Sequence, residues 1–80
     1  MRLKKGSFYW VRFYDHNEET GRIQRDPKYI LNIVGMYMRS DKKRVYLRFA
    51  NFWGDDGRDE DVKTTANIIR KAVISIRELK

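Results

Sequence analysis

Hydrophobic and polar positions alternate along several stretches of the chain, which is the pattern of β-strands that press one face on a core. The first stretch, Phe8–Tyr14, places Tyr9, Val11 and Phe13 on one side, and the other side carries Phe8, Trp10, Arg12 and Tyr14. Small or polar residues that form turns precede and follow it. We therefore expect a strand over Phe8–Tyr14.

The next two stretches predict a β-hairpin. Tyr29–Met38 and Arg44–Trp53 flank the polar, turn-like patch Ser40–Lys43, as the two arms of a hairpin flank their turn. Gly35 in the first arm would weaken a strand unless it marks a bend, as at the corner of a barrel. A helix that begins at Asp26-Pro27 competes, because Pro suits the first helical position. The β-branched and aromatic residues that follow favour the strand.

The remaining segments are a long polar loop, an acidic loop and an ambiguous tail. Asp15–Lys28 is expected to be a loop with a short extended piece near Ile23, and Gly54–Asp61 an acidic loop. In Val62–Lys80, apolar residues at 4-3-4-3 spacing favour an amphipathic helix. Yet eight of these nineteen residues are Val, Ile or Thr, which are poorer helix formers. The extended alternative has a strand at Thr64–Arg70, a tight step at Lys71-Ala72 and a last strand at Val73–Leu79.

The segment Asn67–Ile76 is similar to the closing strand–turn–strand of SH3-like and Sm-like barrels, and it follows a hairpin with a glycine in Ile33–Met36. With the opening strand that ends in Phe13–His16, this order resembles a group of short bacterial and phage proteins without assigned function. The resemblance implies a mostly β fold, a five-stranded SH3-like small barrel. The alternative is an α+β fold, an antiparallel meander with a C-terminal helix.

Two departures limit what the resemblance implies. Sm proteins usually carry Arg-Gly where this chain has Arg70-Lys71. They also hold a base with an Asp and an Asn in the loop after the second strand, and Ser40–Lys43 has no such pair. The resemblance therefore extends neither to the Sm ring nor to its RNA pocket.

Composition narrows the class of protein. Eighty residues suffice for one domain, so we expect residues 1–80 to form a single small β-barrel domain. The absence of cysteine excludes a disulfide framework and a thiolate zinc site. No apolar run approaches the roughly 20 residues that span a bilayer, and the basic N-terminus lacks the apolar segment of a signal peptide. We expect a cytoplasmic protein without a membrane partner.

The net charge of +7 is unevenly distributed. Residues 1–48 hold twelve Lys and Arg against five Asp and Glu, whereas residues 49–80 hold six of each. A localised positive excess is typical of proteins that meet an anionic partner, with nucleic acid first among them. A solubilising surface is the ordinary alternative.

Basic residues with aromatic residues between them gather on the predicted hairpin, and a second basic group lies in the long loop. Lysine and arginine neutralise phosphates, and an exposed ring can stack on an unpaired base. In the alternative interpretation the tyrosines are core or cross-strand residues and the lysines discourage edge pairing. The candidate nucleic-acid-binding residues are Arg39, Lys42, Lys43, Arg44, Arg48, Tyr37 and Tyr46 on the hairpin, and Arg22, Arg25 and Lys28 in the loop.

The sequence offers no set of residues for catalysis. Asp15-His16 could act as a general base and its orienter, but there is no cysteine nucleophile and nothing places a serine near His16. The acidic residues of 55–61 lack the bidentate Glu that a calcium loop requires. We expect no enzyme, no catalytic residue, no metal site and no cofactor. The predicted function is a small binding module for nucleic acid, with a protein-interaction or oligomer-forming module as the alternative.

Overall fold

The computed structural model describes residues 2–17, 19–55 and 59–80. Within these ranges the strands form one antiparallel sheet in the order β4-β3-β2-β1-β5. Single 3₁₀ turns, η1 and η2, directly precede β2 and β5. The elements are β1 (Phe8–Tyr14), η1 (Pro27–Tyr29), β2 (Ile30–Ser40), β3 (Arg44–Gly54), β4 (Asp59–Ile69), η2 (Arg70–Ala72) and β5 (Val73–Leu79).

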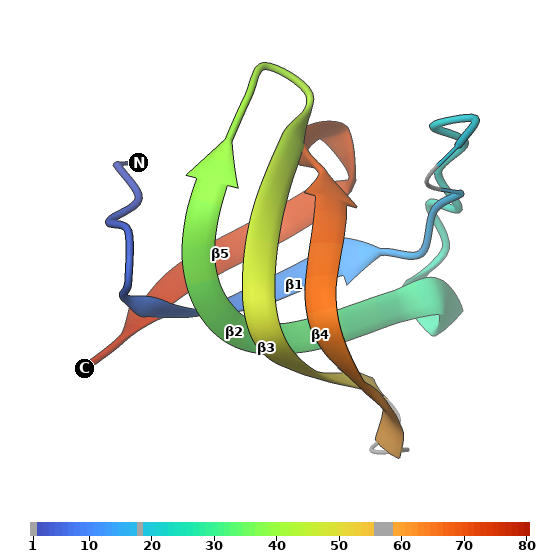
Figure 1. Cartoon of the computed structure of the whole chain (residues 1–80). Coiled ribbons are helices and arrows are strands. Elements are labelled where there is room, and N and C mark those ends of the chain that lie inside the picture. Colours follow the sequence, from blue (N-terminus) through green and yellow to red (C-terminus); the bar gives the residue numbers. More distant parts are fainter. Residues whose placement is uncertain (1, 18, 56–58) are drawn as a thin grey trace.

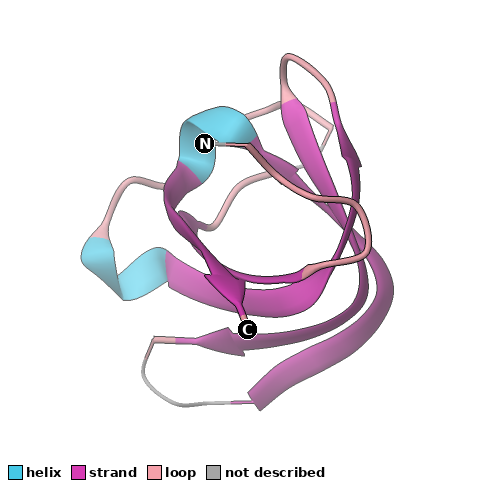
Figure 2. Cartoon of the chain, turned by 90° about the vertical axis from the view of Figure 1, so that its left-hand side faces the viewer, coloured by secondary structure: helices cyan, strands magenta, loops and turns pink. Residues whose placement is uncertain are grey.

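The sheet curls into two layers that cross. Figure 1 shows β2, β3 and β4 in front of β1 and β5, and Figure 2 shows the same sheet wrapped around its interior. β2 bends sharply and belongs to both layers. The pairing of β2 with β3 shifts between Val34 and Met36, on either side of Gly35, and such an irregularity increases the local twist of a strand.

Within the described residues, β4 pairs only with β3 and β5 pairs only with β1. The predicted mostly β, five-stranded architecture is confirmed, but hydrogen bonds between β4 and β5 do not close the barrel. No helix in the described part of the chain has the length and apolar character needed to cross a bilayer.

The core consists of residues at alternate positions of the first four strands, as the pattern predicts. Tyr9 is 1% exposed, and its hydroxyl accepts a hydrogen bond from the Lys4 backbone N–H at 2.7 Å. A buried tyrosine needs such a partner for its polar end. The core cluster is Tyr9, Val11, Phe13, Ile33, Val45, Leu47, Ala66 and Ile68, with Leu3, Leu31, Tyr37, Val73 and Ile76 packed against it.

The first three strands lie where the sequence predicts them. β1 has the predicted bounds, and the hairpin arms differ from prediction by one or two residues. The competing capping signal at Asp26-Pro27 is also present: the Asp26 side chain accepts the Lys28 backbone N–H, and Pro27 occupies the first helical position. It starts only the single turn η1, because the β-branched and aromatic residues after it pair with β1.

The tail is extended, so the amphipathic-helix alternative for Val62–Lys80 is wrong. Its apolar residues instead pair across to β3 and β1, and the step between the strands is η2. The predicted acidic loop Gly54–Asp61 needs correction at both ends, because β3 includes Gly54 and β4 begins at Asp59. Backbone pairing of Asp59 with Trp53 and of Asp61 with Phe52 overrides the low strand propensity of aspartate. Residues 56–58 of that loop lie outside the described residues.

Candidate nucleic-acid interface

Three segments that are far apart in sequence meet at one end of the sheet. They are the β2–β3 turn, η2 and the tip of the loop between β1 and η1. Between them lies a hollow of about 320 Å³, called here the basic cleft. Five of its nine lining residues carry positive charge and one carries negative charge. The lining residues are Glu19, Thr20, Gly21, Lys42, Lys43, Arg44, Ile69, Arg70 and Lys71.

The β2–β3 turn is built around Asp41. Its Oδ1 accepts the backbone N–H groups of Lys43 and Arg44, each at 2.8 Å, and its own N–H donates to the Arg44 carbonyl. The Lys43 and Arg44 N–H groups hold the pKa of the Asp41 carboxyl below its usual value, because they stabilise the ionised form. This carboxylate is therefore engaged by the backbone of the turn.

Arg70 joins η2 to the same turn. Its backbone N–H donates to the Lys43 carbonyl and its Nε donates to the Asp41 carbonyl, both at 2.7 Å. On β3, Arg44 Nη1 donates to Asn67 Oδ1 at 2.7 Å. From the loop, Arg25 Nη2 donates to the Lys71 carbonyl at 3.3 Å. Hydrogen bonds thus hold the walls of the basic cleft in place.

His16 attaches the loop to the end of β4. Its Nδ1 lies 3.0 Å from the Tyr14 carbonyl oxygen, and its Nε2 accepts the Ile69 backbone N–H at 3.3 Å. Because a carbonyl only accepts, Nδ1 is the donor toward Tyr14 and Nε2 is the acceptor from Ile69. Both ring nitrogens are therefore engaged by backbone groups of the chain.

The loop beyond His16 folds on itself. Asn17 Oδ1 accepts the backbone N–H groups of Glu19 and Thr20, each at 2.9 Å. Gly21, with φ of 76°, follows in the left-handed region that glycine adopts without strain. This turn carries Thr20 and Gly21 to the edge of the basic cleft.

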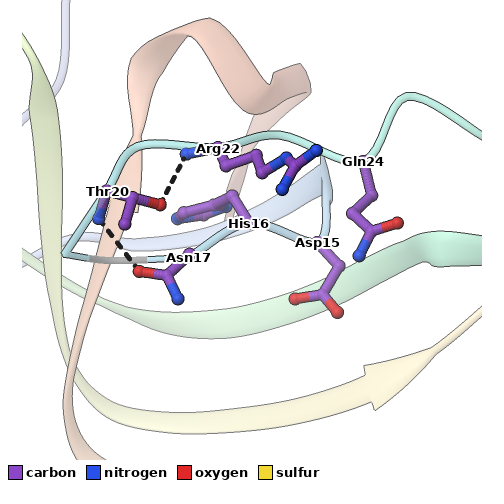
Figure 3. Close-up of a pocket in the computed structure, with 6 residues that line it drawn as sticks. All are labelled: Asp15, His16, Asn17, Thr20, Arg22 and Gln24. Carbon is purple, nitrogen blue, oxygen red and sulfur yellow. Dashed lines mark hydrogen bonds between the residues drawn. The ribbon is translucent and has the colours of Figure 1, made fainter.

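A second hollow, of about 540 Å³, opens on the same loop (Figure 3). Arg22 lies here rather than in the basic cleft, with its side chain extended along the loop toward Gln24. Asp15 and Asn17 also line the hollow. Across the described residues, no three His, Asp or Glu side chains come together in a way that could hold a metal ion.

Neither candidate tyrosine presents a free ring. The Tyr37 ring meets the buried Tyr9 ring edge to face, with centroids 6.1 Å apart, and its hydroxyl lies 2.7 Å from Ser40 Oγ. The Tyr46 ring lies under Arg39, whose guanidinium carbon is 3.9 Å from the ring centroid. Both tyrosines are therefore occupied, as in the alternative interpretation of the sequence.

The structure brings together some of the candidate residues and separates others. Lys42, Lys43 and Arg44 line the basic cleft, and Arg25 reaches its wall. Arg22 lies in the loop hollow and Arg39 lies over Tyr46. Lys28 belongs to η1, and its ammonium is 5.2 Å from the Tyr29 ring centroid. Arg48 is exposed on β3, further from the turn.

The sequence-based selection missed Arg70 and Lys71. Both belong to η2, whereas the extended alternative placed Arg70 at the end of a strand and only Lys71 in the tight step. The signal that places them lies in the pairing: Arg44 is opposite Ile69 in the antiparallel ladder of β3 and β4, so the residues after Ile69 must lie beside the β2–β3 turn.

No protein-family model, no curated protein and no solved structure matches this chain. The resemblance to SH3-like and Sm-like barrels and to short bacterial and phage proteins stays a prediction. What the basic cleft does must therefore be argued from its own geometry and charge.

Proposed function

We propose that this chain is a non-enzymatic binding module that engages nucleic acid through the basic cleft. The observation that carries the proposal is the convergence of five cationic residues from two separate segments on one hollow. Lysine and arginine bind the phosphate backbone and release its condensed counterions. A surface of this kind recognises phosphates rather than a base sequence.

Three lysines of the basic cleft are available to a ligand. In the part of the chain that the structure describes, no carboxylate pairs with the side chains of Lys42, Lys43 or Lys71. The nearby carboxylate of Asp41 accepts backbone N–H groups instead. The cleft walls are also fixed in advance by the bonds of Arg70 and Arg25, which lowers the ordering cost of binding.

The direct test is the affinity of purified protein for labelled single-stranded and double-stranded oligonucleotides, measured by fluorescence anisotropy over a range of salt. We expect log affinity to fall linearly with log salt, with a slope of about −0.7 per contacted phosphate of a single strand. The double variant Lys42→Glu with Lys43→Glu should bind at least about tenfold more weakly and with a shallower slope. Both residues are exposed, so the fold should survive.

The matched control is Arg77→Glu with Lys80→Glu, which changes the net charge equally at the end of β5 that lies away from η2. It should lose much less affinity. Absence of any binding at low salt would remove the proposal. An equal loss in the control would show that net charge, rather than the basic cleft, accounts for binding.

A second candidate function, self-association or protein interaction, is favoured by a different observation. Phe8 and Leu79 are 44% and 42% exposed and lie opposite each other on β1 and β5, and contiguous exposed apolar surface often marks an interface. Light scattering after gel filtration tests it, because a stable oligomer without oligonucleotide affinity favours this function.

As the compartment we propose the cytoplasm, in keeping with the lack of cysteine.

A further inference from the structure

Arg39 and Tyr46 form a stacked pair near the turn end of the β2–β3 hairpin. They are directly opposite each other on the two strands, and the guanidinium carbon lies 3.9 Å from the ring centroid. This is van der Waals contact, which a planar guanidinium reaches by lying flat over the ring. Arg39 is exposed and Tyr46 is half-buried. The ring therefore supports the arginine, which is itself exposed to solvent.

The pair is held on several sides. Tyr46 belongs to β3, between Arg39 on β2 and Asn67 on β4. Its hydroxyl lies 3.5 Å from Asp41 Oδ2, and Asp41 is itself fixed by two backbone N–H groups. The ring on which Arg39 rests is thus positioned before any ligand arrives, which reduces the entropy lost on binding.

A concave surface adjoins the pair. Arg39 lines a hollow of about 500 Å³ together with Met36, Tyr37 and Met38 of β2 and with Lys5 and Gly6. The lining of this hollow is mainly apolar, and its charged residues, Lys5 and Arg39, are both positive. Arg39 lies two residues before Asp41, so the stacked pair is close in sequence to the β2–β3 turn that lines the basic cleft.

We propose that Arg39, held flat on Tyr46, is a stacking platform for one unpaired base. Unpaired bases stack on arginine planes as well as on aromatic rings, and the mainly apolar lining of the adjoining hollow suits the edge of a base. Lys42 and Lys43, in the turn that follows, take the neighbouring phosphates. This inference rests on the proposed function and names its ligand class as single-stranded nucleic acid, because the bases of a duplex are not free to stack.

Arg39→Lys is the decisive variant, because it keeps the charge and removes the plane. For an oligothymidylate of about ten nucleotides, we expect affinity to fall about tenfold, within the range measured for one base stack. The slope of log affinity against log salt should not change, since the number of charges is the same. An oligonucleotide of the same length without bases should bind wild-type protein as weakly as it binds the variant.

Two further variants complete the experiment. Arg77→Lys makes the same chemical change on β5, away from the turn, and should bind like the wild type. Tyr46→Leu removes the support of Arg39 but keeps an apolar side chain, and should weaken binding of the normal oligonucleotide but not of the base-free one. Circular dichroism confirms that each variant retains the fold.

The outcomes separate this inference from the function on which it rests. If Arg39→Lys binds the normal oligonucleotide as tightly as wild type does, the stacking platform is refuted. The same holds if the variant loses as much affinity for the base-free oligonucleotide as for the normal one. In both cases the proposal of nucleic-acid binding is unaffected. A wild-type protein that binds no oligonucleotide at low salt overturns both. Equal affinity for a duplex and a single strand of the same length also contradicts the platform.

Discussion

The outer face of β1 and the turn end of the sheet both concentrate polar side chains, but they use them differently. On the outer face, Trp10 Nε1 donates to Asn32 Oδ1 at 2.9 Å, and Asn32 Nδ2 donates to Asp55 Oδ1 at 2.6 Å. Arg12 Nη2 completes the chain with a 2.7 Å bond to Asp55 Oδ2. Donors and acceptors there satisfy one another.

At the turn end the hydrogen bonds go mainly to the backbone, and several lysine charges stay without an acidic partner among the described residues. The electrostatics reflect this difference. Arg12 and Asn32 lower the pKa of Asp55, and Asp55 raises the pKa of Arg12. Charge that is paired within the chain supports the fold, whereas the lysines of the basic cleft are the charges that we propose for binding nucleic acid.

The largest expected effect on stability is at Asn32, which is 2% exposed. Asn32→Leu keeps the approximate shape but leaves the Trp10 indole N–H and one Asp55 oxygen without their partner. We expect a loss of about 2 kcal/mol in the free energy of unfolding, measured by urea denaturation. Oligonucleotide affinity should be unchanged. A folded variant with weakened binding would show that the two regions are not independent.

A smaller loss is expected at His16, which connects the loop to β4. His16→Ala deprives the Tyr14 carbonyl and the Ile69 N–H of a partner, which should cost about 1 kcal/mol of stability. It should also weaken oligonucleotide binding several-fold, because the loop tip that lines the basic cleft is released. Gln24→Ala in the same loop is the control for both measurements. A variant that is destabilised but binds oligonucleotide normally would show that the loop is not part of the binding surface.

The smallest effect is the acid dependence of Asp41 and Asp55, since both side chains are exposed. The pKa of each carboxyl is lowered in the folded protein. Each therefore adds stability above the unfolded aspartate pKa of about 3.9, and this contribution is lost as the pH falls through the folded pKa. Thermal melts of Asp41→Asn and Asp55→Asn should approach the wild type as the solution is acidified.

Salt distinguishes the two carboxylates. The ion pair of Asp55 with Arg12 is screened by added salt, so the effect of Asp55→Asn at neutral pH should shrink in high salt. The effect of Asp41→Asn should persist, because its main partners are backbone N–H groups of the same turn. Identical salt responses would contradict the contrast between the two regions.

Local alternation was sufficient to predict β1 and the hairpin, because these strands press one face on the core. The spacing of apolar residues in the tail favoured a helix, whereas the resemblance to small barrels favoured the extended form that includes β5. The prediction failed where a segment is extended because it pairs with a neighbouring strand rather than because of its own residues. The acidic start of β4 at Asp59 is extended through its pairing with β3, despite its composition. The separation of β4 from β5 is likewise a property of the whole sheet, and no local pattern reports it.

The site was only partly predictable for the same reason. Lys42, Lys43 and Arg44 are adjacent in sequence and could be found, whereas Arg70 and Lys71 join them only through the β3–β4 ladder. The position of Arg39 opposite Tyr46 depends on hairpin register. That register shifts twice, between Val34 and Met36 and again between Tyr37 and Arg39, and alternation alone cannot locate such irregularities.

The position of β1 has a consequence for synthesis of the chain. β1 lies between its nearest neighbour in sequence, β2, and the last strand, β5, so that Phe8 pairs with both Met36 and Leu79. The chain must emerge from the ribosome as far as Leu79 before β5 can pair with the second edge of β1. Until then β1 offers unpaired backbone groups to neighbouring nascent chains. Translation that stalls within η2 should therefore yield an aggregation-prone product, even though four of the strands are already present.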